Sequence, residues 1–496
     1  MIQLHGGTQP IALGGNLTLC APGLKGTARV LPTAQATTRG AELGTPELDA
    51  ALARAGLEEV ALVELSVNLA PLPPAAATMR GPDGSEAFEL TVGDPGPDHG
   101  QVVLSVDEAG AIHWHVAEPE DPALPVASTR GAGAVRRYRI PKEVATPDAA
   151  DAAIPTTRSL IGLVGRKLLK VLIYPIGDAI FGPVIDKAVG WWEGKKRPHR
   201  LGRYLPDDHG ELQPADWASL QQGRALLWVH GTFSTSKAAF GDLDPQALST
   251  LTQRYGQRSF AFDHPSLSAS PAENVKWFFS QMPADACLEV DIVCHSRGGL
   301  VSRLLADPAA SGIDPQRFKV RRLVLVGVPN AGTPLANGDH MVAFLDRLTT
   351  AINLKSPTPD WADVLEAVLM VVKVVGHAGV VGLDGLAAMD PASPWLQQLN
   401  AQGLPGTTLY GIGADFEPAS KGLAAAFCTG ADSLVDRIFE EAPNDLVVPS
   451  VGMSVWGGSQ QVPTERFLNF PSARGVMHTH YFEQPETAQH LLAWLG

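Results

Sequence analysis

Three side chains that could together form a nucleophilic hydrolase site occur in this chain in the order serine, aspartate, histidine. Ser296 follows the apolar run Leu288–Cys294, Asp445 lies in the segment Asn444–Pro449, and His478 is near the C-terminus. A serine hydroxyl is too weakly acidic to attack a carbonyl at neutral pH, so it needs a histidine to take its proton and a carboxylate to orient that histidine. We therefore interpret Ser296 as the nucleophile, His478 as the general base and Asp445 as the acid.

The residues around Ser296 predict the element that would expose its hydroxyl. The preceding apolar run has the character of a buried strand, and Leu300–Ala306 has helical spacing. A sharp strand-to-helix turn needs small neighbours, which Gly298 and Gly299 supply. Cys294 occupies the place of the first glycine in the pattern G-x-S-x-G, and a cysteine is small enough to fit there.

A second strand end would supply hydrogen-bond donors for a developing oxyanion. The apolar run Arg224–Val229 ends in His230-Gly231-Thr232, about 65 residues before the serine. In enzymes whose nucleophilic serine lies at such a strand-to-helix turn, one backbone N–H comes from the loop after an early strand. The other comes from the residue that follows the nucleophile. We assign these donors to Thr232, with Phe233 as the second choice, and to Arg297.

Two of the assignments have rivals in the sequence. His480 lies two residues after His478, so either imidazole could face the serine. Asp415 directly ends the strand-like run Thr408–Ala414, whereas Asp445 has the more suitable local context. We favour His478 and Asp445 and keep His480 and Asp415 as alternatives.

The residues from about 201 to the end resemble an α/β-hydrolase of the bacterial lipase and esterase kind. The resemblance rests on the His-Gly-Thr loop, the Cys-His-Ser-Arg-Gly-Gly turn, Gly332-Thr333-Pro334, Met389–Asn400, Asn444-Asp445 and His478. It implies a mostly parallel sheet flanked by helices, with a helical cap in the insertion at about 336–395. It also implies a serine esterase or lipase that needs no metal or cofactor.

The resemblance leaves several functions open. An apolar cap would line a cleft for a hydrophobic acyl or alkyl group, so the substrate would be a small-molecule or lipid ester. A phospholipase or an acyltransferase would use the same three residues. The rival from another class is a scaffold or binding protein on a hydrolase fold that has lost its activity. The full set of serine, histidine and aspartate favours catalysis.

Composition excludes some other classes of partner. The chain has 496 residues and a formal net charge of -14, which makes nucleic acid an unsuitable partner because phosphate binding needs a basic surface. Four cysteines without paired spacing predict neither a disulfide framework nor a cysteine metal site. His113 and His115 could be read as a metal pair, but no nearby ligand set accompanies them. The sequence leaves the oligomeric state undetermined.

The chain is expected to comprise three parts. Residues 1–155, rich in short alternating runs and turn residues, predict a β-rich domain of unknown role. Residues 156–200 read as a helical apolar connector, and residues 201–496 form the hydrolase domain. Arg166, Lys167 and Lys170 in the connector raise the alternative of a helix lying at a membrane surface. The N-terminus lacks the pattern of a secretory signal, so we expect a cytoplasmic location, with non-classical export as the alternative.

Overall fold

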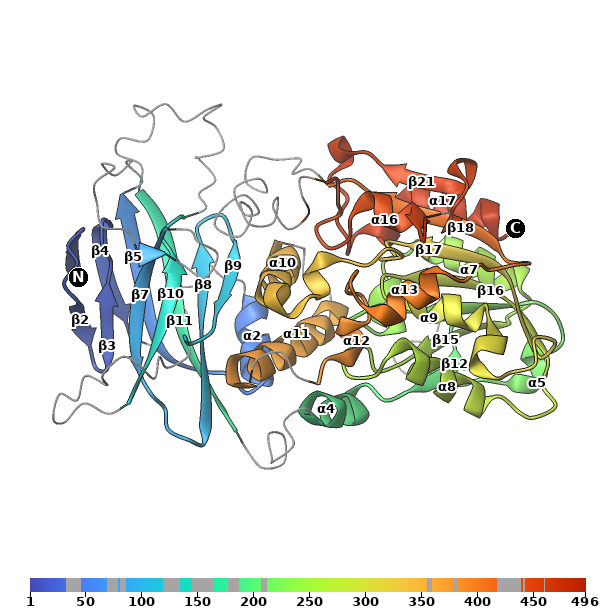
Figure 1. Ribbon diagram of the computed structural model, residues 1–496, viewed down its shortest axis with the longest axis horizontal. Coiled ribbons are helices and arrows are strands. Elements are labelled where there is room, and N and C mark those ends of the chain that lie inside the picture. Colours follow the sequence, from blue (N-terminus) through green and yellow to red (C-terminus); the bar gives the residue numbers. More distant parts are fainter. Residues whose placement is uncertain are drawn as a thin grey trace.

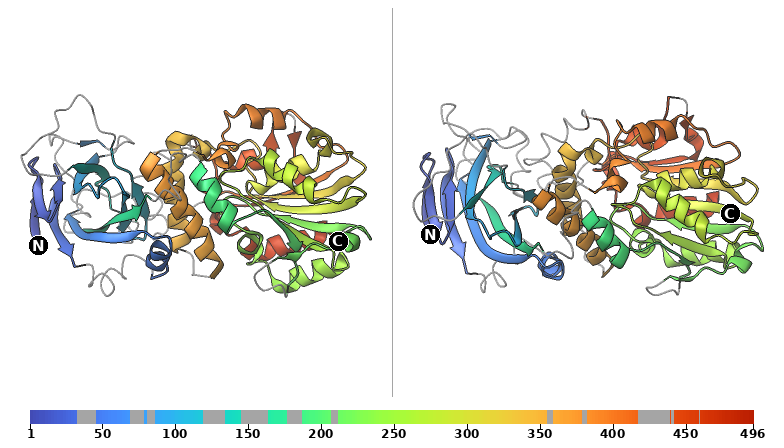
Figure 2. Two further views of the ribbon diagram at one scale, coloured as in Figure 1. Left: turned by 90° about the horizontal axis from the view of Figure 1, so that it is seen from below. Right: turned by 60° about the horizontal axis from the view of Figure 1, so that its bottom comes forward.

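The computed structural model of the chain places a pair of β-sheets at one end and a mixed, helix-flanked sheet at the other (Figure 1). The helices of the predicted cap lie between them in each view (Figures 1 and 2). The structure describes residues 1–32, 46–68, 79–80, 86–118, 134–144, 164–176, 187–206, 212–354, 359–378, 382–416, 439, 442–458 and 460–496.

The N-terminal part contains two antiparallel sheets that pack face to face. The six-stranded sheet has the order β1-β4-β5-β11-β8-β9, and the other has the order β10-β7-β3-β2, with β6 paired to β7. Apolar side chains from both sheets, among them Leu19, Leu90, Val63 and Leu169, share one buried cluster. The strands are β1 Ile2–His5, β2 Ile11–Gly14, β3 Leu17–Cys20, β4 Lys25–Leu31, β5 Glu58–Asn68, β6 Met79–Arg80, β7 Glu86–Gly93, β8 His99–Asp107, β9 Ile112–His115, β10 Val135–Pro141 and β11 Val164–Pro175.

Strand β11 corrects the prediction of a helical connector over 156–200. Residues 164–175 form a strand between β5 and β8, near the middle of the six-stranded sheet. Both of its faces are covered, Leu169 by the second sheet and Leu168 by the core that includes the cap. An apolar run of this kind cannot be distinguished from a buried helix by periodicity alone. Only α4, Ala188–Lys196, is helical among the described residues of the connector.

The lysines of β11 are buried in ion pairs, so the membrane-surface interpretation of this segment is wrong. Lys167 is 1% exposed and lies 3.4 Å from a carboxylate oxygen of Asp107. Lys170 is 3% exposed and contacts Asp49 at 2.6 Å and Glu59 at 3.2 Å. No helix in the described part of the chain is both long enough and apolar enough to cross a bilayer.

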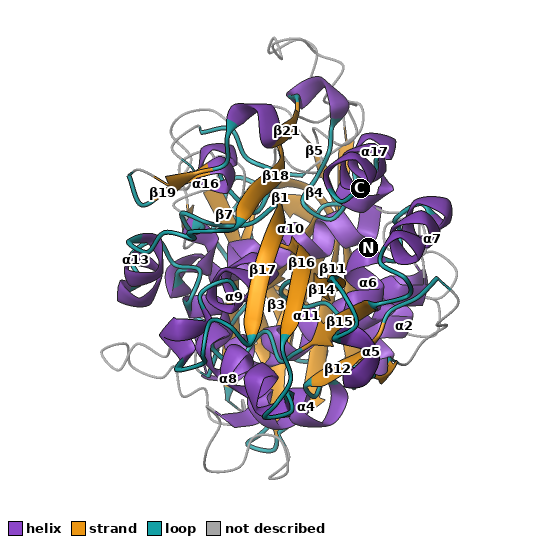
Figure 3. Cartoon of the chain, turned by 90° about the vertical axis from the view of Figure 1, so that its right-hand side faces the viewer, coloured by secondary structure: helices purple, strands orange, loops and turns teal. Residues whose placement is uncertain are grey.

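The C-terminal part is built on an eight-stranded sheet with the order β13-β12-β15-β14-β16-β17-β18-β21 (Figure 3). Strand β12 runs antiparallel to β13 and β15, and the remaining neighbours are parallel. The mostly parallel sheet expected from the sequence is therefore present, with β12 and β13 as its antiparallel part. Its strands are β12 Arg200–Arg203, β13 Gln213–Pro214, β14 Ala225–Val229, β15 Ser259–Asp263, β16 Leu288–His295, β17 Phe318–Val326, β18 Thr408–Ala414 and β21 Phe467–Phe470.

Helices cover both faces of this sheet because its central strands are apolar on both sides. On one face Trp228 and Val293 pack with Leu251 of α7 and Leu491 of α17. On the other face α8 and α9 pack against Leu227, Ile292 and their neighbours. The helices are α7 Pro245–Arg254, α8 Pro271–Gln281, α9 Gly298–Leu305 and α17 Pro485–Trp494.

The insertion after β17 carries the helices that join the two halves of the molecule. Its elements are η5 Pro334–Ala336, η6 Gly338–His340, α10 Met341–Leu354, α11 Pro359–Ala378, α12 Asp384–Ala387 and α13 Pro394–Asn400. Apolar residues of α10 and α11 belong to one continuous core with Leu104 and Leu168 of the N-terminal sheet and Leu227 of the C-terminal sheet. The cap is therefore packed on both sides.

The shorter elements complete the description. They are α2 Pro46–Arg54, α5 Trp217–Leu220, α6 Ser236–Phe240, η4 Pro308–Ser311, α16 Ser450–Ser454, β19 Val455–Trp456, β20 Gln460–Gln461, η7 Thr464–Arg466, η8 Ser472–Arg474 and η9 Tyr481–Glu483.

Candidate active site

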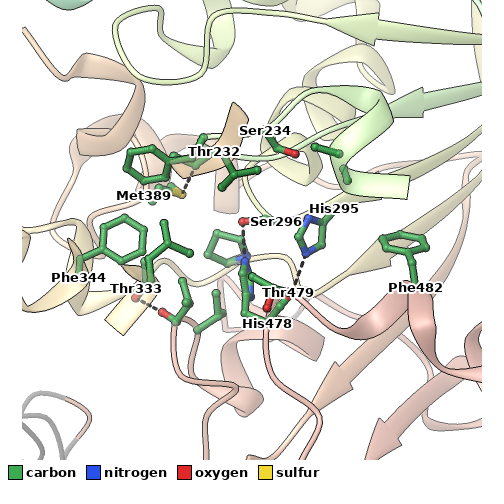
Figure 4. A pocket seen from close by; sticks show the side chains of 18 residues that line it. Thr232, Ser234, His295, Ser296, Thr333, Phe344, Met389, His478, Thr479 and Phe482 are labelled. Atoms are coloured by element: carbon green, nitrogen blue, oxygen red, sulfur yellow. Dashed lines mark hydrogen bonds between the residues drawn. The ribbon is translucent and has the colours of Figure 1, made fainter. Parts of the chain in front are cut away.

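Ser296 lies at the sharp turn between β16 and α9. Its backbone has φ +53°, a left-handed conformation that is uncommon for a residue with a side chain. The turn is held by a hydrogen bond from the Ser296 amide to the carbonyl of Val326 at 2.9 Å. The side chain borders a small pocket, into which its hydroxyl points (Figure 4). The element predicted from the sequence is thus present in the structure.

The turn depends on neighbours without a Cβ atom. A Cβ at Gly231 would lie 2.6 Å from the Cβ of Ser296, and one at Gly298 would lie 2.3 Å from the carbonyl oxygen of His230. At position 294, by contrast, there is room for a side chain. That of Cys294 is fully buried, and its Sγ lies 3.3 Å from the carbonyl oxygen of Val324. A cysteine is therefore accommodated where the usual pattern has glycine.

The structure brings together the three side chains that were proposed as nucleophile, base and acid. The Nε2 atom of His478 is 2.9 Å from Oγ of Ser296, and its Nδ1 atom is 2.7 Å from Oδ2 of Asp445. With the proton on Nδ1, the imidazole donates to the carboxylate and accepts from the serine hydroxyl. This is the arrangement in which Nε2 can take up the serine proton.

The carboxylate of Asp445 is completely buried and fully hydrogen-bonded. Its Oδ1 accepts from the backbone amides of Val447 at 3.1 Å and Val448 at 2.8 Å. Its Oδ2 accepts from the hydroxyl of Tyr481 at 2.8 Å as well as from the histidine. Burial, followed by the charge of Asp445, raises the pKa of Tyr481, so the phenol keeps the proton that it donates.

Tyr481 is a site residue that the sequence analysis missed. Its partner, Asp445, is 36 positions away in the chain, and a tyrosine three residues after a histidine has no distinctive pattern. The contact becomes visible only when both loops are placed.

The two alternative residues lie away from this chain of hydrogen bonds. Asp415 is partly exposed at the end of β18, its amide bonds the carbonyl of Phe470, and burial of its carboxyl raises its pKa. The amide of His480 bonds the carbonyl of Met477, and it is the ring of His478 that contacts the serine. The geometry favours His478 and Asp445.

The predicted oxyanion donors differ in their availability. The backbone amides of Thr232 and Arg297 donate to no acceptor within the described ranges, and Thr232 lines the same pocket as Ser296. The amide of Phe233, the second choice, donates to the hydroxyl of Ser266 at 3.2 Å. Thr232 and Arg297 therefore keep donors that a ligand could use.

The side chain of Arg297 has a different task from its amide. It is completely buried, and its guanidinium donates to the carbonyl of Gly385 at 2.7 Å and to the carbonyl of Ala269. Burial lowers its pKa to about 10, so it remains charged at neutral pH. The residue after Ser296 thus ties helix α12 to the loop that precedes α8.

A buried glutamate in the connector supports the same region. Glu193 of α4 accepts hydrogen bonds from the amides of Ser266 at 2.7 Å, Leu267 at 2.9 Å and Ser268 at 2.8 Å. Ser266 in turn holds the amide of Phe233 in the loop that follows β14. The helix α4 therefore contributes to the loop beside Ser296, although it precedes the mixed sheet in the chain.

The imidazole of His230 stabilises this loop in its neutral form. Its Nδ1 lies 2.8 Å from the carbonyl oxygen of Gly231, and its Nε2 accepts from the amide of His264 at 3.1 Å. Burial, partly offset by the charge of Asp263, lowers the pKa of His230 to about 4. Burial also lowers the pKa of His264, whose ring stacks on His230 with centroids 4.3 Å apart.

The pocket beside Ser296 is small and mainly apolar. Its volume is about 50 Å³. The cap contributes Phe344, Leu348, Val364 and Met389 to its lining, and loops at the edge of the mixed sheet contribute Phe233 and Val448. Phe344, Met389 and Thr232 lie on the side of Ser296 away from Phe482 (Figure 4). The space next to the hydroxyl is therefore narrow and lined mainly by apolar side chains.

The histidines of β9 have protein partners. His113 Nδ1 lies 3.4 Å from a carboxylate oxygen of Asp346, and His115 Nε2 lies 2.9 Å from the hydroxyl of Ser105. Within the described ranges, no group of three or more histidine, cysteine, aspartate or glutamate side chains is arranged to hold a metal ion.

The chain is similar to several solved hydrolase structures at low sequence identity. They include phospholipase PlaB from Legionella pneumophila (15% identity, 47% of this chain, TM-score 0.31), of which the chain spans 46%. They also include lipase 1 from Pelosinus fermentans (12% identity, 55% of this chain and 97% of that one, TM-score 0.35). The match to a hydrolase from Pseudomonas aeruginosa PA01 has 16% identity and a TM-score of 0.33, and it covers 60% of this chain and 93% of that one.

No curated protein matches the sequence. A protein family does match it, over residues 197–496, which begin just before β12 and include the whole mixed sheet and its cap. The chain therefore belongs to the family described as Domain of unknown function (DUF7379).

Proposed function

We propose that this protein is a serine hydrolase that cleaves carboxylic esters through an acyl-enzyme intermediate. The observation that carries the proposal is the continuous set of hydrogen bonds from Ser296 through His478 to Asp445, at 2.9 and 2.7 Å. A buried serine at a strained turn, bonded to an imidazole that a carboxylate orients, is the arrangement that makes a hydroxyl nucleophilic.

The reaction would proceed in two halves. Oγ of Ser296 attacks the ester carbonyl as its proton passes to Nε2 of His478, and the carbonyl oxygen becomes an oxyanion near the amides of Thr232 and Arg297. The imidazolium then gives its proton to the departing alcohol, and the C–O bond breaks to leave the acyl-enzyme. Water, deprotonated by the same imidazole, then attacks the acyl carbon. The bond from this carbon to Oγ breaks, the imidazolium returns its proton to Oγ, and the acid leaves.

The environment of Asp445 supports its role as the residue that orients the base. Four donors surround the buried carboxylate, so it is held as an acceptor for the imidazole N–H. The imidazolium formed during the reaction would be stabilised by this charge at short range. The carboxylate itself needs no proton at any step.

The proposal is tested with p-nitrophenyl esters and Ser296→Ala. We expect the purified full-length protein to release p-nitrophenol, and the variant to lose at least about 10³-fold in kcat. Ser280→Ala, on the exposed end of α8, is the matched control and should retain full activity. Equal turnover by Ser296→Ala and the wild type would refute the proposal, as would the absence of any ester hydrolysis.

A further inference from the structure

The wall of the pocket opposite the hydrolase sheet is formed by the cap. Phe344 and Leu348 are four residues apart on α10, so they share one face of that helix, and Val364 comes from α11. The ring of Phe344 lies 5.7 Å from that of Phe233, centroid to centroid. The depth of the pocket is therefore determined by where α10 lies.

A second face of α10 is hydrogen-bonded to an edge strand of the N-terminal sheet. Asp346 accepts from the amide of Trp114 at 2.7 Å, and the hydroxyl of Thr349 accepts from the indole N–H of Trp114 at 3.1 Å. The hydroxyl of Thr350 accepts from the amide of Ile112 at 2.9 Å and lies 3.2 Å from the carbonyl oxygen of the same residue. These bonds are all buried, so each loss would leave an unsatisfied polar group.

The strand involved is β9, at the edge of the six-stranded sheet. An edge strand has backbone groups that no neighbouring strand uses. Here side chains of α10 occupy them, because Asp346 and Thr350 bond the main chain of β9 and Asn353 bonds the carbonyl of Gly110 at 3.1 Å. Helix α10 thus covers the edge of the sheet, and these hydrogen bonds fix its position along β9.

A third side of α10 reaches the loop that carries the acid. The guanidinium of Arg347 donates to the carbonyl of Leu446 at 2.7 Å, and both residues are buried. Leu446 follows Asp445 and has φ +81°, a backbone conformation that needs support. The position of α10 is therefore coupled to the acid loop as well as to the pocket.

The neighbouring helix α11 is fixed to the same sheet. The hydroxyl of Tyr174 in β11 donates to the carbonyl of Lys373 at 2.7 Å, and the ammonium of Lys373 donates to the carbonyl of Ala55. A Cβ at Gly376 would lie only 2.4 Å from Cγ1 of Val102, so helix and sheet are in close contact there. The cap wall that bears Val364 is thus seated on the N-terminal sheet.

From these contacts we infer that the N-terminal sheet is a positioning element of the hydrolase site, and that through α10 it limits the acyl group to a short chain. The inference rests on the proposed function. The small volume of the pocket, about 50 Å³, and its wall of bulky apolar side chains suit a short acyl chain better than a long one. The positioning residues are Trp114, Thr349 and Thr350, and the residues that determine specificity are Phe344 and Leu348.

The pocket wall is tested by measuring kcat/KM for p-nitrophenyl acetate, butyrate and octanoate. The wild type should prefer acetate or butyrate. Leu348→Ala should raise the ratio of octanoate to acetate by at least about tenfold, since a single methylene in an apolar pocket changes discrimination by that much. A wild-type preference for octanoate, or an unchanged ratio in Leu348→Ala, would overturn the inference.

The role of the N-terminal sheet is tested with Thr349→Val, which removes the acceptor of the Trp114 indole. Its matched control is Thr250→Val on α7, because both hydroxyls bond the carbonyl four residues earlier, and only Thr349 also bonds β9. Thr349→Val should change the octanoate-to-acetate ratio of kcat/KM by about fivefold, because that factor corresponds to the net free energy of one buried hydrogen bond. Thr250→Val should leave it unchanged.

A second variant keeps the test decisive if Thr349→Val does not fold. Trp114→Phe removes the same indole donor from the other side, so the two substitutions should not be additive when combined. Equal ratios in the wild type, Trp114→Phe and Thr349→Val would refute positioning by the sheet while leaving the proposed function standing. Absence of ester hydrolysis by the wild type, by contrast, would overturn both.

Discussion

At the scale of single residues, the geometry of the site depends on the backbone amides and the one phenol that donate to the carboxylate of Asp445. The carboxylate of Asp445 has two amide donors on one oxygen and the imidazole and Tyr481 on the other. A carboxylate bound on both oxygens cannot rotate, so the imidazole that it orients has a fixed direction toward Ser296. Besides the imidazole itself, the phenol is the one donor of this set that belongs to a side chain and can be removed by substitution.

Tyr481→Phe should therefore weaken catalysis without abolishing it. A hydrogen bond to a charged group contributes about 1.5–3 kcal/mol, and we expect a loss of about tenfold or more in kcat/KM. Steady-state kinetics with a p-nitrophenyl ester measure this loss.

The control for that substitution is Tyr410→Phe. Tyr410 lies on β18, where its ring stacks on Trp494 with centroids 4.9 Å apart. The control should match the wild type in kcat/KM. If Tyr481→Phe matched it too, the phenol would have no part in orienting the acid.

Asp445→Asn should show which carboxylate serves the histidine. The amide can keep an acceptor oxygen but favours the wrong imidazole tautomer, a change that costs about 10⁴-fold in kcat in serine proteases. Asp415→Asn is the matched control, because Asp415 is the competing aspartate at the end of β18. Steady-state kinetics should show a large loss for the first variant and none for the second, and the reverse result would transfer the role to Asp415.

At the scale of elements, the turn after β16 requires glycine at position 298, because the backbone at the end of β14 lies very close to it. Gly298→Ala would place a Cβ 2.3 Å from a backbone oxygen of His230, which cannot move without shifting β14. We expect the free energy of unfolding to fall by several kcal/mol, in the range of severe overpacking or backbone strain. Denaturant unfolding followed by circular dichroism measures this.

Gly194→Ala is the matched control, since nothing lies within 4 Å of its added Cβ and it sits within helix α4. Alanine favours a helix over glycine by about 1 kcal/mol, so this variant should be as stable as the wild type or more stable. A similar stability for both alanine variants would contradict the view that the turn at Ser296 requires Gly298.

The elements also show what could be predicted from sequence and what could not. The strand before Ser296 and the helix after it were predicted because an apolar run, small residues and helical spacing follow one another locally. Strand β11 was misread because both of its faces are buried, which removes the alternation that marks a strand. The burial of Lys167 and Lys170 in ion pairs depends on Asp107, Asp49 and Glu59, which are distant in the chain.

At the scale of the whole molecule, buried neutral histidines make stability depend on pH. The folded state lowers the pKa of His230 to about 4 and lowers that of His264 below 6.5, whereas both are near 6.5 in an unfolded chain. Between these pKa values the unfolded chain binds more protons than the folded one. The contribution of these histidines to stability is therefore complete above about pH 6.5 and is lost as the pH falls toward about 4. Each histidine can contribute up to about 1.4 kcal/mol per pH unit in that window.

Denaturant unfolding at about pH 7.5, 6 and 5 measures this dependence. We expect the free energy of unfolding to decrease as the pH falls, and His264→Gln to show a smaller decrease than the wild type. His5→Gln, at an exposed position of β1, is the matched control and should keep the wild-type slope. Identical slopes for all three proteins would show that the buried pair is not responsible.

The packing of α11 against both halves has a consequence for synthesis on the ribosome. The N-terminal sheets are complete once residue 175 has emerged, yet the helix that covers Val102 and Tyr174 is encoded about 200 positions later. Until then an apolar surface stays open to water and to other nascent chains. We expect truncated chains that stop before residue 359 to aggregate, and a fragment starting at residue 197 to do the same from the opposite side.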